Sequence, residues 1–201
     1  MNENTPVIVS TEQVMSSEGY PYTLSLRKVD IEDEKTLNHF IKSCEKLVRL
    51  SPEYKLWTNY VRDVLGYTTC SITGEKHCET TVEIHHHPIS LYSYIKAIIL
   101  KKSTDSEEFC SFDIATCIIE EHYNMKVPFC LLLKSMHQKF HNGFLRIPME
   151  IIVGDIEYFM KKYMHYLEDD EVDTILKRTK VNKENCGWAD GYKWSKDNYA
   201  K

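Results

Sequence analysis

The sequence lacks a long hydrophobic run. A membrane-spanning helix needs about 18 consecutive apolar residues, and the apolar stretches of this chain are only a few residues long. The first residues also lack the basic cluster and apolar segment of a signal peptide. The seven cysteines are odd in number and follow no repeating framework, which favours free thiols over disulfides. These absences predict a cytoplasmic protein with no membrane partner.

A strong charge of either sign is also absent. The formal net charge is −5 over 201 residues, so any contact with phosphate groups would require a local patch or a bound cation. One basic patch lies in residues 177–201, which also carry aromatic rings at Trp188, Tyr192, Trp194 and Tyr199. Such rings suit either packing on the domain or stacking on bases. Charge therefore neither requires nor excludes a nucleic-acid partner.

The composition that is present belongs to a folded chain. With 42% hydrophobic and 11% aromatic residues, we expect a single domain, residues 1–201, of mixed α+β class and rich in helix. Apolar residues recur with the period of an amphipathic helix over about 33–50, 90–102 and 112–123. β-Prone runs lie at 68–72, 80–86, 127–132 and 148–153, and the first two are expected to form a hairpin. A further short helix is expected over about 134–142.

Five of the nine histidines fall in two tight groups. His85, His86 and His87 end a predicted strand, while His137 and His141 lie four residues apart on the predicted short helix and therefore share one face. Zinc and related ions take imidazole ligands, and a site with three protein ligands keeps one coordination position open. The pair together with one member of the triplet would supply such a set. The alternative is a polar surface pair and a polar strand end.

At these residues the sequence resembles the HNH family of ββα-metal nucleases, most closely HNH proteins encoded by phages. The likeness rests on Glu-Ile-His-His-His-Pro at 83–88 and on the His-x-x-x-His helix within 136–143, and it covers about residues 70–143. It implies that the strand ending at His86 pairs antiparallel with 127–132 and that the histidine helix packs across both. The implied divisions are an arm and two helices at 1–66, a core at 67–143 with a helical insertion at 90–123, and a helix and tail at 144–201.

The resemblance also implies roles for individual residues. It makes His85, His137 and His141 metal ligands and His86 the general base. The family's buttressing Asn normally lies just before the second strand, and here Asn124, several residues earlier, is the candidate. The same triplet would also accommodate His86 as the ligand and His87 as the base, so the register within it stays open.

The function implied is that of a metal-dependent endonuclease acting on nucleic acid, with DNA favoured over RNA as the partner. The expected cofactor is a divalent ion, Zn, Mn, Ni or Mg, and imidazole ligands favour the transition metals over Mg. Two alternatives stay open. One is an inactive binding module of the same fold that holds nucleic acid or a host protein, and the other is a regulator of host transcription or an inhibitor of a defence system.

Overall fold

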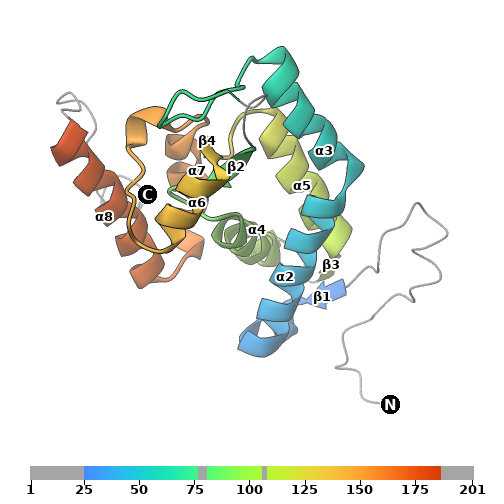
Figure 1. Ribbon diagram of the computed structural model, residues 1–201. Helices are drawn as coiled ribbons and strands as arrows, with labels where there is room; N and C mark the ends of the chain where they lie inside the picture. The colour runs from blue at the N-terminus through green and yellow to red at the C-terminus, as the bar shows by residue number, and fades with distance from the viewer. Residues whose placement is uncertain (1–24, 77–80, 106–107, 187–201) are drawn as a thin grey trace. The chain divides into compact units, whose positions relative to one another are not determined.

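The computed structural model describes residues 25–76, 81–105 and 108–186 (Figure 1). The chain divides into two compact units. Unit 1 runs to Trp57 and resumes over residues 91–124, and unit 2 comprises 58–90 and the chain from 125 onward. The class is mixed α+β and rich in helix, which confirms the predicted class. The expectation of a single domain stays a prediction, because two compact units can belong to one cooperative domain.

Unit 1 consists of helices and one small sheet. α2 (Glu34–Leu50) begins at Asp33, whose carboxylate accepts the backbone N–H of Thr36. α2 packs against α4 (Leu91–Asp105) and α5 (Ser111–Tyr123), and α3 (Pro52–Asn59) starts in this unit. β1 (Ser25–Arg27), which η1 (Lys28–Glu32) follows, pairs antiparallel with β3 (Glu108–Cys110). The buried face of α2 contains the apolar positions that predicted it: Leu37, Phe40, Ile41, Cys44, Leu47 and Val48.

Unit 2 is built around a two-stranded antiparallel sheet. β2 (Val82–His86) pairs with β4 (Phe129–Leu133), and the register sets Glu83 opposite Leu132 and His85 opposite Cys130. α6 (Lys134–His141) follows β4 directly and contacts both strands. The remaining elements are η2 (Tyr60–Val64), η3 (Met149–Ile151), α7 (Ile156–Tyr163), η4 (Met164–Tyr166) and α8 (Asp169–Cys186).

The face of the β2–β4 sheet that meets α6 is fixed by alternation along the strands. Successive strand residues point to opposite faces, so Cys130 and Leu132 share one face. That face packs with Ile147 and with two side chains of α6, Met136 and Phe140. Because of the register, Glu83 and His85 lie on the same face, toward α6.

Two predicted strands are not formed. Thr69 and Lys76 make an isolated bridge, and the chain between them is a tight turn in which Gly74 has a φ of 75°. The apolar β4 is the partner of β2 instead, so the predicted hairpin of 68–72 with 80–86 is wrong. In 148–153, η3 forms and only Val153 pairs, with Phe129.

The two ends of the chain lie largely outside the described residues. The predicted arm before residue 25 and the aromatic side chains after residue 186 are among these. The backbone of α8 extends to Cys186. Its first turn carries Asp169, Asp170 and Glu171, and carboxylates are favourable at a helix N-terminus. Within the described residues, no helix combines the length and apolar character that crossing a bilayer requires.

Candidate metal centre

The candidate site lies between β2 and α6. Glu83 and His85 are two residues apart on one strand and share a face. His137 and His141 are four residues apart on α6 and share a face of that helix. Since α6 packs over the strand, the two periodicities bring these four side chains together.

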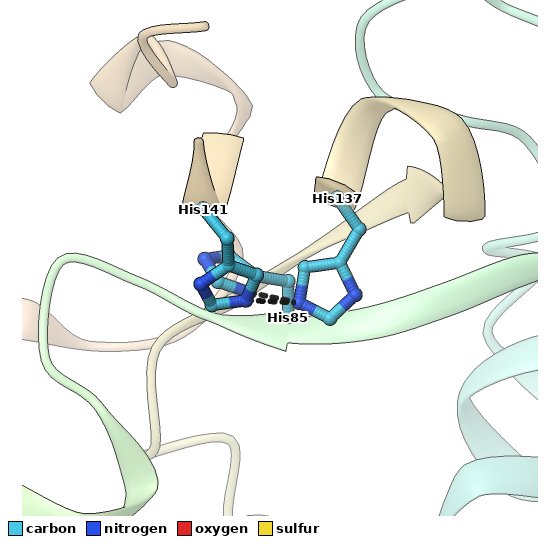
Figure 2. A group of neighbouring side chains, drawn as sticks. All are labelled: His85, His137 and His141. Carbon is cyan, nitrogen blue, oxygen red and sulfur yellow. Dashed lines mark hydrogen bonds between the residues drawn. The ribbon is translucent and has the colours of Figure 1, made fainter. Parts of the chain in front are cut away.

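The three imidazole rings converge on one point (Figure 2). Nδ1 of His85 lies 2.9 Å from Nε2 of His137, and Nε2 of His141 lies 2.9 Å from the same Nε2 atom. All three nitrogens lie within 4.8 Å of one another. His137 is thus the central member of the three-histidine site, which we define as His85, His137 and His141.

A carboxylate lies on the other edge of the central ring. Oε2 of Glu83 is 2.7 Å from Nδ1 of His137. A carboxylate only accepts hydrogen bonds, so Nδ1 is the donor in this contact, and Nε2 is the nitrogen that has a lone pair in the corresponding tautomer. This lone pair faces His85 and His141.

The aromatic ring of Phe140 packs against the imidazole rings of this region. The ring of Phe140 makes edge contacts with His85 at 4.7 Å and with His87 at 5.2 Å between centroids. It also lies 5.6 Å from the ring of His141. Packing of this kind restricts the rotamers of the imidazoles.

The donor set fits a divalent transition metal. Four-coordinate zinc holds imidazole nitrogens at about 2.0–2.1 Å, which sets the nitrogens about 3.3 Å apart. The observed contacts of 2.9 Å need to open by only a few tenths of an ångström. Cys130, opposite His85 in the register, stays a packed thiol, because burial raises its pKa to about 12.

The structure brings together three of the five predicted site residues. His85, His137 and His141 form the cluster, so His85 is the member of the triplet whose ring nitrogen lies with those of the helix pair. His86 is paired with Phe129 and points to the opposite face of the strand. Asn124 is the C-cap residue of α5 and belongs to unit 1.

Glu83 is the site residue that sequence reasoning missed. The sequence indicated this residue only through its spacing: Glu83 lies two residues before His85, so both side chains lie on one face of a strand. That spacing carries meaning only once α6 is known to cover the same face.

Comparison with known proteins identifies a family over most of the chain. Residues 9–192 match the family described as bacteriophage G278-like virion proteins. No curated protein and no solved structure gives a significant match. The expectation of a phage protein is therefore confirmed.

The same match corrects the predicted family and activity. The matched family is one of virion proteins, so the assignment to the HNH nucleases and the predicted endonuclease function are wrong. The base role of His86 and the buttressing role of Asn124 were implied by that assignment alone, so they lose its support and stay untested predictions. The reason is physical: a strand end and a helix turn suffice to gather three histidines, so a local histidine pattern does not determine the family. The match extends over both units, and by it the chain belongs to the bacteriophage G278-like virion protein family.

Proposed function

We propose that this chain is a metal-binding component of a phage particle, and that one divalent transition metal ion held by the three-histidine site fastens α6 to β2. The observation that carries the proposal is the convergence of three imidazole nitrogens within 4.8 Å. The family supplies the setting, a virion.

A structural role fits the character of α6. This helix has eight residues, and each of its side chains is exposed or half-buried. Isolated helices this short are unstable in water, and most helical stability in proteins comes from packing of an apolar face. An ion that joins two residues of α6 to a strand compensates for that small buried face.

Zinc is the ion we favour. Neutral imidazoles suit Zn, Ni and other transition metals, whereas Mg prefers oxygen ligands and keeps several waters. The three histidines leave one position of a tetrahedral ion for water or a further ligand. His141 is the exposed member of the site, and His85 is the buried one.

Elemental analysis of the full chain, purified without an affinity tag and dialysed against Zn, tests the proposal. We expect one metal ion per chain, and we expect His137→Ala to lose it because that substitution removes the central ligand. His165→Ala is the matched control, since His165 is an exposed histidine of η4 in the same unit. Metal content at background in the wild type after exposure to Zn, Ni, Mn and Co would overturn the proposal.

Particle association has its own test. Peptides of this chain should be found by mass spectrometry in purified particles of the phage that encodes it, and at the same ratio to other particle proteins after repeated density gradients. Loss of these peptides on purification would contradict the virion role. Contact with nucleic acid and synthesis in the host cytoplasm stay predictions, and the basic tail that suggested the former lies mainly beyond the described residues.

A further inference from the structure

Glu83 contacts the three-histidine site without belonging to its set of converging nitrogens. We propose that Glu83 is a positioning residue that sets the tautomer and orientation of His137 for metal binding. This inference rests on the proposed metal function. It concerns how tightly the site holds its ion.

The geometry gives Glu83 access to one ring nitrogen only. Its Oε2 atom is 2.7 Å from Nδ1 of His137, whereas Nε2 points from the opposite edge of the ring toward His85 and His141. A carboxylate on the Nδ1 edge and an ion on the Nε2 edge occupy different sides of one imidazole. Glu83 in this position supports a ligand and does not itself coordinate the ion.

The hydrogen bond settles which nitrogen is available. In a neutral imidazole either nitrogen can carry the proton, and the tautomer protonated on Nε2 cannot ligate through that atom. Glu83 accepts a hydrogen bond from Nδ1–H and so holds His137 in the tautomer with a free lone pair at Nε2. The negative charge also raises the basicity of the ligand and partly neutralises the ion.

The central place of His137 makes this control effective. Both 2.9 Å contacts of the site end on its Nε2 atom, one from the strand and one from the next turn of α6. A rotation of this single ring would move it out of reach of both neighbours. Orienting His137 therefore orients the site.

Three variants of the full chain test the inference: Glu83→Gln, Glu83→Ala and the control Glu75→Gln. Glu75 is an exposed carboxylate of unit 2 that lies outside the metal centre. Zinc affinity is measured by competition with a chromophoric chelator, and the absorption spectrum of the Co(II) form reports coordination geometry. The melting temperature in chelator shows whether each metal-free variant folds as the wild type does.

We expect both Glu83 variants to bind zinc about 10- to 100-fold more weakly, the range found for loss of a carboxylate partner of a metal-ligating histidine. The loss should be smaller for Gln, whose side-chain oxygen can still accept a hydrogen bond from Nδ1–H, and Glu75→Gln should bind as the wild type does. Melting temperatures in chelator should stay the same, because the Glu83 side chain is 36% exposed.

Several results would overturn the inference while leaving the metal site intact. One is wild-type zinc affinity in both Glu83 variants. Another is a Co(II) spectrum showing that Glu83→Gln loses an oxygen ligand, since Glu83 would then bind the ion directly. A fall in the metal-free melting temperature that accounts for the whole change in affinity would assign Glu83 a purely structural role. A wild type that binds no metal at all would instead overturn the proposed function itself.

Discussion

His122 lies in unit 1 with its imidazole enclosed by aromatic rings. The ring centroid of Trp57 is 4.5 Å away and that of Tyr54 is 5.4 Å away, both at edge-on angles. Nδ1 of His122 donates to the carbonyl oxygen of Ile118 at 2.7 Å, and Trp57 donates its indole N–H to the carbonyl oxygen of His122. This histidine serves packing, and its neutral form is the one that the surroundings accept.

Burial lowers the pKa of His122 to about 4, since desolvation disfavours the charged ring. In the unfolded chain the pKa returns to about 6.5. The unfolded state therefore binds the extra proton between these two values, and stability falls as the pH drops from about 6.5 to about 4, by about 3 kcal/mol in total. Urea unfolding across this range measures the loss.

The His122→Phe variant isolates that contribution. Phenylalanine keeps an aromatic ring against Trp57 and removes the titrating group, so its stability should depend less on pH by about the same amount. His39→Gln, at an exposed position of α2, should retain the full dependence. An unchanged acid slope in His122→Phe would show that other groups cause the acid sensitivity.

At the scale of elements, the segment after η3 depends on a close contact between the backbone of Gly154 and that of Val127. Gly154 has a φ of 105°, and a Cβ atom built there would lie 2.6 Å from the carbonyl oxygen of Val127. This approach accompanies the bridge in which Phe129 and Val153 exchange backbone hydrogen bonds of 2.8 and 2.7 Å. Glycine is required here both by the dihedral angle and by the available space.

Gly154→Ala should therefore destabilise the chain by about 2–4 kcal/mol in denaturant unfolding. Gly143→Ala is the matched control: its φ is 76°, and nothing lies within 4 Å of the added Cβ. The stability of this control should fall only by the cost of a left-handed backbone conformation, about 1 kcal/mol. Equal losses in the two variants would mean that the contact with Val127 relaxes without cost.

A second prediction at the scale of elements concerns α6. At a free zinc concentration of about 100 times Kd, an ion bound only by the folded chain adds about 2.7 kcal/mol of stability, equivalent to a rise in Tm of about 5–10 °C for a chain of this size. Calorimetry with zinc and with chelator measures the shift. His141→Ala should lose most of it, and an equal shift in that variant would place the ion elsewhere.

The sequence was sufficient for elements whose pattern is local. Helix period alone located α2, α4 and α5. The apolar run at 127–132 predicted the strand β4, but its pairing with β2 was implied only by the resemblance to the HNH family. The run at 68–72 was wrong as a strand because Gly74 closes a turn before pairing can extend. For the site, spacing predicted the pair His137 and His141 with one member of the triplet, and the resemblance implied that this member is His85. The place of Glu83 depends on a strand register and a helix contact that arise only in the folded chain.

At the scale of the whole molecule, the effect of the ion should be confined to one unit. We expect hydrogen exchange in β2, β4 and α6 to slow when zinc is added, because the ion suppresses local opening of the elements that it joins. Exchange in α2 and α5 of unit 1 should change little. Protection spread equally over both units would indicate that the chain opens only as a whole.

The antiparallel pairing of β2 with β4 has a consequence for the chain that connects these two strands. Residues 87–128 leave the sheet after His86 and return to it at Phe129, and these two residues are direct partners across the strands. Paired residues of adjacent strands lie about 5 Å apart, so the intervening segment departs and returns through neighbouring points. The segment is in effect the long connection of a β-hairpin. The length of this segment therefore does not set the register that holds Glu83 and His85, which the hydrogen bonds between the strands fix.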